Sequence, residues 1–156
     1  MANALGDKES YQVLMERSKN YRNLFDKSTG FLRARWEDGS WVTPYDPGIP
    51  YYVYMYRESN GWMSTFFAPQ DPEGLIALYP NKAEFEAKLD AVFSTPFGGY
   101  EADNMTGWYG MYCVGNQPSQ GVSYYYYFVG KPEKTQEKID VIMNDYSAMG
   151  KEGLAY

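Results

Sequence analysis

The chain has 156 residues, the length of one ordinary domain, so we expect a single domain over residues 1–156. Hydrophobic residues make up 44% and charged residues 22%, a globular composition that argues against disorder. A formal charge of −6, without any cluster of Lys and Arg, excludes a nucleic-acid-binding surface. The absence of His excludes Ser-His-Asp and Cys-His triads, and the single Cys excludes an intramolecular disulfide framework.

The sequence shows no targeting or membrane segment. Residues 1–8 contain no apolar run long enough for a signal peptide. The longest aromatic run, residues 124–129, is too short to span a bilayer. We therefore expect no membrane partner, and the localisation stays unknown.

In the first third of the chain, the spacing of Tyr11, Leu14, Tyr21 and Phe25 predicts a helix over residues 8–25 with one apolar face. Asp38-Gly39 is a favoured two-residue turn and predicts a short hairpin over residues 31–43. A proline-rich loop follows over residues 44–50, and residues 51–56 are expected to be extended.

The middle third predicts three helices. The first covers residues 57–68 and places Glu58 and Trp62, four positions apart, on one face. A short helix over residues 73–79 follows two prolines. Asn81 is expected to cap a helix over residues 81–93, whose apolar residues recur at helical spacing.

The last third begins with a glycine-rich stretch over residues 97–117, which predicts a long irregular loop. Residues 118–129 are expected to form a helix that is apolar nearly all round and therefore interior. A final helix is predicted over residues 132–148, with a buried face formed by Ile139, Ile142, Met143 and Tyr146. The expected fold class is mostly α with an accessory β-hairpin.

Four sequence blocks occur in a defined order along the chain. They are Glu58-Ser-Asn-Gly-Trp62, Phe67-Ala-Pro-Gln-Asp71-Pro-Glu-Gly-Leu75, Gly115-Asn-Gln-Pro-Ser119 and Val129-Gly-Lys-Pro-Glu-Lys-Thr-Gln136. In order and spacing they resemble glycoside hydrolase family 92, the calcium-dependent exo-acting α-mannosidases. The resemblance runs from about Tyr21 to Leu154, which is nearly the whole chain.

The resemblance implies that the chain is a segment of an (α/α) barrel-like helical toroid with calcium as the cofactor, although the sequence does not identify the metal ligands. It also implies inverting hydrolysis of terminal α-linked mannose, which needs an acid and a base carboxylate. Gln117 occupies the position of the family's general acid, and the family's base lies in a segment after Leu154 that these residues do not include. We therefore expect a catalytically incomplete domain.

The resemblance assigns Glu58, Asn60 and Trp62 to positions that face the sugar. The Trp ring offers an apolar platform, while Glu and Asn exchange hydrogen bonds with hydroxyl groups. A helix start with a core Trp explains the same residues without a ligand. Asp71 is expected either to hold a sugar hydroxyl or to cap the helix that follows it.

Asn116, Gln117 and Ser119 lie at the start of the helix predicted from Pro118, where free backbone N–H groups form a weak hydroxyl-binding corner. Ordinary capping is the alternative. We interpret Tyr124 to Tyr127 as core residues rather than a carbohydrate-stacking platform. Cys113 has no basic neighbour in sequence and is expected to be an inert buried thiol.

Three functions follow from these residues. The first is an α-mannosidase-like domain that lacks catalytic carboxylates, and the second is a mannose- or carbohydrate-binding module. The third is a truncated or artificial scaffold without a ligand. A mannose-containing glycan is the expected partner, and the charge of −6 favours a monomer over a homodimer. The resembled family is typically periplasmic or extracellular.

Overall fold

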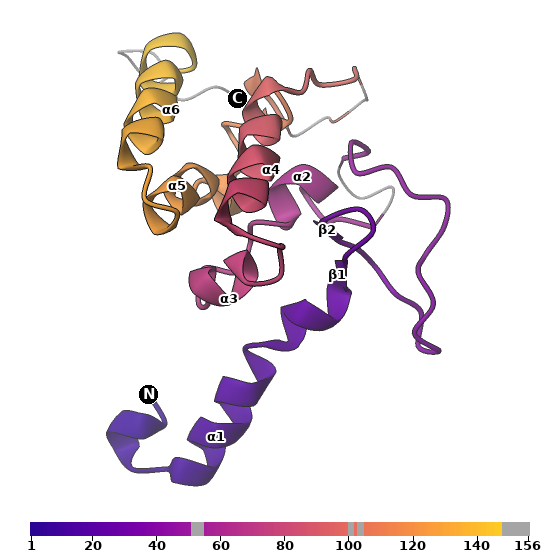
Figure 1. Cartoon of the computed structure of the whole chain (residues 1–156), viewed down its shortest axis with the longest axis vertical. Helices are drawn as coiled ribbons and strands as arrows, with labels where there is room; N and C mark the ends of the chain where they lie inside the picture. The colour runs from indigo at the N-terminus through magenta and orange to yellow at the C-terminus, as the bar shows by residue number, and fades with distance from the viewer. Residues whose placement is uncertain (51–54, 100–101, 103–104, 148–156) are drawn as a thin grey trace.

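A computed structural model describes residues 1–50, 55–99, 102 and 105–147. It is mostly helical and carries two small antiparallel sheets, each of two strands (Figure 1). The extended segment predicted at residues 51–56 lies largely outside the described residues. Among the described helices, none is long and apolar enough to cross a bilayer.

The N-terminal segment extends away from the rest of the molecule as an arm (Figure 1). It contains η1 (Asn3–Leu5), α1 (Lys8–Arg17) and η2 (Asn20–Leu24). The prediction of one helix over residues 8–25 is therefore wrong beyond Arg17. Tyr11 and Leu14 are exposed, whereas Phe25 is buried. Helical spacing indicates which side chains share a face, but not whether another element covers that face.

The first sheet pairs β1 (Phe25–Asp26) with β2 (Phe31–Leu32), an antiparallel pairing that the sequence analysis did not predict. The hairpin predicted at residues 31–43 is reduced to one bridge between Arg35 and Trp41. Its turn is present, because Gly39 has a φ of 85° and donates its N–H to the Trp36 carbonyl.

Two short helices follow in the middle of the chain, α2 (Gly61–Ser64) and α3 (Pro72–Ile76). The predicted helix over residues 57–68 is wrong, because Asn60 caps α2 and Glu58 has a left-handed φ of 49°. Glu58 and Trp62 therefore do not share a helix face.

The longest helix of the middle region, α4 (Lys82–Ser94), confirms the prediction over residues 81–93. Asn81 caps it, since its Oδ1 accepts the Glu84 backbone N–H at 2.9 Å. Four of its apolar residues are buried: Phe85, Leu89, Val92 and Phe93. The glycine-rich stretch after it is less irregular than expected, because β3 (Trp108–Tyr109) pairs with β4 (Tyr112–Cys113).

The helix predicted over residues 118–129 is broken into η4 (Gln117–Ser119), η5 (Val122–Tyr124) and α5 (Tyr125–Phe128). It is not interior all round, because Tyr124 and Tyr127 are exposed whereas Tyr125 and Tyr126 are buried. Tyr125 and Tyr126 belong to the core, as predicted, but Tyr124 and Tyr127 do not.

The last described helix is α6 (Pro132–Asp145), as predicted in position. Its predicted buried face needs correction. Ile142 and Tyr146 pack against the core, but Met143 is 61% exposed. Residue 148, the expected end of this helix, lies outside the described residues.

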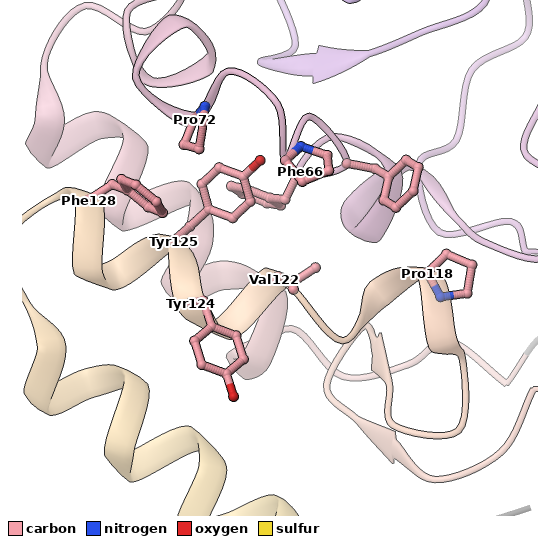
Figure 2. Close-up of a pocket in the computed structure, with 10 residues that line it drawn as sticks. Phe66, Pro72, Pro118, Val122, Tyr124, Tyr125 and Phe128 are labelled. Carbon is pink, nitrogen blue, oxygen red and sulfur yellow. The ribbon is translucent and has the colours of Figure 1, made fainter. Parts of the chain in front are cut away.

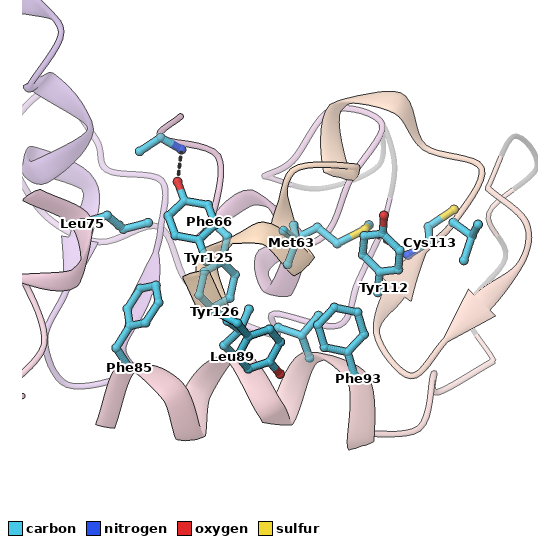
Figure 3. Close-up of a cluster of buried hydrophobic side chains, with 14 of the residues drawn as sticks. Met63, Phe66, Leu75, Phe85, Leu89, Phe93, Tyr112, Cys113, Tyr125 and Tyr126 are labelled. Carbon is cyan, nitrogen blue, oxygen red and sulfur yellow. Dashed lines mark hydrogen bonds between the residues drawn. The ribbon is translucent and has the colours of Figure 1, made fainter. Parts of the chain in front are cut away.

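The core forms where α4 and α5 meet α2 and the second sheet (Figure 3). Phe66 and Phe85 meet edge to face, with ring centroids 5.4 Å apart, and Tyr125 packs beside both. The Tyr125 hydroxyl accepts the Ala68 backbone N–H at 3.3 Å, so its polar end is satisfied inside the core. The aromatic richness of the sequence is thus used mainly for packing.

Candidate functional site

Asn116 joins two of the sequence blocks in space. Its Nδ2 group donates to the carbonyl of Glu58, and its Oδ1 atom accepts the Ser119 hydroxyl at 2.9 Å. Asn116 is itself buried, whereas the neighbouring Gln117 and the Glu58 residue are exposed. We refer to Glu58, Asn116 and Gln117 as the polar corner.

Asn60 supports this corner from inside the protein. It is fully buried, its Oδ1 atom accepts the Met63 backbone N–H at 2.9 Å, and its Nδ2 group donates to the Met111 carbonyl at 3.0 Å. One side chain thus caps α2 and fastens it to the turn between β3 and β4. Asn60 is positioned to hold the backbone rather than to contact a ligand.

Gln117 begins η4, and its backbone carbonyl accepts the Gln120 N–H at 3.2 Å. Its side chain offers a carboxamide, which donates and accepts hydrogen bonds but does not ionise. The corner therefore combines a carboxylate at Glu58 with a neutral amide at Gln117. A carboxylate accepts hydrogen bonds from hydroxyl groups, and a carboxamide both donates and accepts them.

Trp62 lies on α2 against the first sheet and is half-buried. Its ring meets Phe31 edge to face, with centroids 4.9 Å apart. The Lys88 Nζ atom lies 5.3 Å from the Trp62 ring centroid and 3.4 Å from that of Phe31. Burial lowers the pKa of Lys88 to about 8. The sequence analysis missed this lysine, because only the fold brings it from α4 to these rings.

Asp71 belongs to a different cluster. Its Oδ1 atom caps α3 by accepting the Gly74 N–H at 3.1 Å, which confirms the expected cap. Its Oδ2 atom accepts the Tyr21 hydroxyl at 3.0 Å and the Arg22 Nη2 group at 2.7 Å. Burial alone would raise the pKa of Asp71, but the hydrogen bonds from Arg22 and Tyr21 lower it below its ordinary value.

An apolar groove of about 350 Å³ lies beside η4 and α5 (Figure 2). Pro72, Tyr125 and Phe128 lie near one end, and Pro118 lies near the other. Its walls are mostly rings and proline side chains, so few polar groups converge on it. A sugar needs several hydroxyl partners, and this groove does not supply them.

Metal ligands do not gather in the described part of the chain. No three side chains of Asp, Glu, His or Cys there lie close enough to share an ion. Calcium takes six to eight oxygen ligands, so these residues do not fit it. Cys113 is fully buried, and burial raises the pKa of its thiol, in keeping with an inert side chain.

Comparison with known proteins gives a consistent picture. The sequence profile of the glycosyl hydrolase family 92 catalytic domain matches residues 1–155. A family GH92 α-mannosidase from Bacteroides thetaiotaomicron, solved in complex with mannoimidazole, superposes with a TM-score of 0.89 at 28% identity, over 99% of this chain and 21% of that chain.

Two further relatives agree. An inverting GH92 mannosidase from the same bacterium superposes with a TM-score of 0.79 at 28% identity, over 98% of this chain and 22% of that chain. A protein described as an uncharacterized secreted glycosidase from Arthroderma benhamiae is 25% identical over 80% of this chain and 17% of its own length. The chain thus spans about a fifth of the length of these relatives. The fold is that of a segment of these α-mannosidases, and the chain belongs to glycosyl hydrolase family 92.

Proposed function

We propose that the chain is an α-mannosidase-like segment that meets sugar at the polar corner and is catalytically incomplete. Family membership supports the substrate class, because both solved relatives described above are mannosidases and one of them is inverting. An inverting glycosidase protonates the leaving oxygen with one carboxylic acid, while a second carboxylate activates water on the opposite face.

The proposal rests on the identity of residue 117, which is Gln. It occupies the position at which the resembled family has its general-acid Glu, and it is exposed at the start of η4. A carboxamide can hydrogen-bond a glycosidic oxygen, but it cannot release a proton to it at neutral pH. Loss of a general acid lowers the rate by about 10²–10⁴.

The remaining corner residues have two different roles in this proposal. Glu58 and Gln117 have exposed side chains and contact the sugar hydroxyls, the carboxylate as an acceptor and the carboxamide as a donor. Asn116 and Asn60 are buried, so they position the two loops without touching sugar. Trp62 is assigned to the sugar only by the family resemblance, since its ring packs against Phe31 and Lys88.

An independent carbohydrate-binding module is less well supported. Asn60, Asp71 and Asn116 all engage their side-chain polar atoms in hydrogen bonds within the protein. No step of the proposal depends on calcium, since the described carboxylates do not gather into a site. An exported setting, which the family resemblance implies, agrees with the description of the fungal relative as secreted.

A mannose titration followed by protein NMR tests the sugar-facing role of the corner. A single monosaccharide with two or three hydrogen bonds should bind with a dissociation constant of about 1 mM, near −4 kcal/mol. We expect amide shifts at residues 58–60 and 115–117. Glu58→Gln should weaken binding about tenfold, because it removes a charged acceptor.

Glu133→Gln is the matched control, because it removes the same charge from the exposed first turn of α6. It should leave the mannose affinity unchanged. The assignment is wrong if the shifts cluster outside the corner, if both variants behave alike, or if no residue responds to mannose at tens of millimolar.

A further inference from the structure

Trp36 is the most exposed of the four tryptophans, with 62% of its surface accessible to solvent. The other three rings each have a neighbouring side chain against them, namely Phe31 at Trp62, Phe97 at Trp108 and Arg35 at Trp41. Among the described residues, no other ring and no cation lies against Trp36. Trp36 therefore offers the largest accessible indole surface of the chain.

We propose that Trp36 and Glu37 form a second sugar site, a platform that binds the apolar face of a neutral pyranose ring. The inference goes beyond the proposed function, because it involves none of the residues of the polar corner. The loop of residues 33–50, which carries Trp36, extends away from the helical part of the molecule (Figure 1).

The turn that carries Trp36 is held in place by hydrogen bonds on both sides of the ring. The Trp36 N–H donates to the Ser40 carbonyl at 2.8 Å, and the Gly39 N–H donates to the Trp36 carbonyl at 2.9 Å. The Arg35 Nε and Nη2 groups donate to the Gly39 carbonyl at 2.8 and 2.6 Å. Asp38 Oδ1 accepts the Ser40 N–H at 2.8 Å and its hydroxyl at 2.6 Å. A ligand thus meets a turn that is already ordered, which lowers the entropic cost of binding.

The exposed ring borders a shallow hollow on the surface. The hollow has a volume of about 560 Å³, and Trp36, Glu37 and Asp38 line it. This volume is in the range of small-molecule sites. Glu37 is exposed and has no ion pair or hydrogen bond from its side chain within the part of the chain that the structure describes. Its carboxylate is therefore available as an acceptor beside the ring.

The chemistry of this hollow matches a neutral sugar. A pyranose has an apolar face of C–H groups, which suits the indole ring, and hydroxyl groups at its edge, which a carboxylate accepts. The negative charges of Glu37 and Asp38 disfavour an acidic sugar, because like charges repel. The nearest cation along the chain, Arg35, is already engaged with the Gly39 carbonyl.

A quaternary ammonium group is the alternative ligand, since an aromatic ring beside carboxylates also attracts cations. The neutral sugar is favoured because the chain belongs to a glycoside hydrolase family. The two ligands are separated by titrating the same protein with methyl α-mannoside and with choline.

A titration of the whole chain with methyl α-mannoside, followed by protein NMR, tests the proposal. The Trp36 indole N–H and the amides of residues 36–40 should shift with a dissociation constant of about 10 mM, because a platform offers fewer partners than a pocket. Trp36→Ala should weaken binding at residues 37–40 about tenfold. It should leave the shifts at residues 58–60 and 115–117 unchanged.

Tyr127→Ala is the matched control, because it removes another exposed ring, on α5, that does not line the hollow. It should leave all the shifts of residues 36–40 unchanged. Trp36→Tyr should restore part of the affinity, because it keeps an aromatic face.

The inference is overturned if residues 36–40 do not respond at about 100 mM methyl α-mannoside, ten times the expected dissociation constant. It is also overturned if Trp36→Ala binds as the wild type does, or if choline shifts this turn and the mannoside does not. Shifts at the polar corner alone contradict this inference and support the proposed function. Shifts at residues 36–40 alone support this inference and contradict the proposed function.

Discussion

Asp26, in β1, and Arg33, directly after β2, form a buried ion pair. The Arg33 Nη1 and Asp26 Oδ2 atoms are 3.0 Å apart, and the two side chains are only 9% and 4% exposed. The Arg33 Nε and Nη2 groups donate to the Val42 carbonyl at 3.2 and 2.7 Å, and its guanidinium lies 4.4 Å from the Tyr45 ring centroid. This arginine therefore connects β1 to the loop that follows the Asp38-Gly39 turn.

The substitution Arg33→Met keeps most of the side-chain volume and removes the charge. Asp26 would then stay buried with Ser28 as its remaining donor, through the backbone N–H at 2.9 Å and the hydroxyl at 2.6 Å. Removing one partner of a buried pair costs about 3–5 kcal/mol. Because small domains are stable by about 5–15 kcal/mol, this change removes a large share of the total.

Urea unfolding followed by circular dichroism measures the loss as a change in the free energy of unfolding. Arg35→Met is the matched control, because Arg35 is exposed and lies two residues further along the chain. It should cost less than about 1 kcal/mol. The reasoning is refuted if the two variants lose similar stability.

The pH dependence of the same variant gives a second readout. Burial on its own raises the pKa of Asp26, but the hydrogen bonds from Ser28 and Arg33 lower it below its ordinary value. The stabilisation is therefore present above the unfolded pKa of about 3.9 and is lost as the pH falls through the folded pKa. Without Arg33 the carboxyl becomes easier to protonate, so the deficit of Arg33→Met should shrink between pH 7 and pH 4.

Two further predictions concern α2 and the turn between β3 and β4. Asn60→Ala should cost about 2–4 kcal/mol, because it removes the α2 cap and leaves the Met111 carbonyl unpaired; a loss below 1 kcal/mol in urea unfolding would contradict the buried role. Gly110→Ala should prevent the β3–β4 turn from forming as observed, because φ is +61° and a Cβ would lie 2.6 Å from the Phe93 carbonyl oxygen. Loss of Trp108 and Tyr112 amide dispersion in NMR spectra would show this, whereas an unchanged spectrum would refute it.

The helices that could be predicted from sequence are those whose limits are set by local chemistry. Asn81 caps α4, Asp71 with Pro72 begins α3, and Pro132 begins α6, so each start is encoded within a few residues. The start of α2 could not be predicted in this way. It depends on a left-handed backbone at Glu58, a non-glycine residue whose carbonyl accepts a hydrogen bond from the Asn116 amide, 58 residues further along the chain.

The prediction that all four residues from Tyr124 to Tyr127 are buried was wrong for a related reason. Composition favours burial of all four rings, but only tertiary contacts decide that Tyr126 lies fully inside while Tyr127 faces outward. The site followed the same division. The sequence blocks single out Glu58, Asn60, Asn116 and Gln117 alike as candidates, and only the structure shows that Asn60 and Asn116 use their side chains to bind the backbone inside the protein.

Release of mannose from an α-1,2-linked mannose disaccharide, with calcium added, tests the central claim most directly. The wild-type chain and the Gln117→Ala variant should both turn over more than about 10²-fold more slowly than an intact family 92 enzyme, because neither supplies a proton donor at that position. Turnover by the wild-type chain within about 10²-fold of an intact family 92 enzyme, lost in Gln117→Ala, would contradict the account.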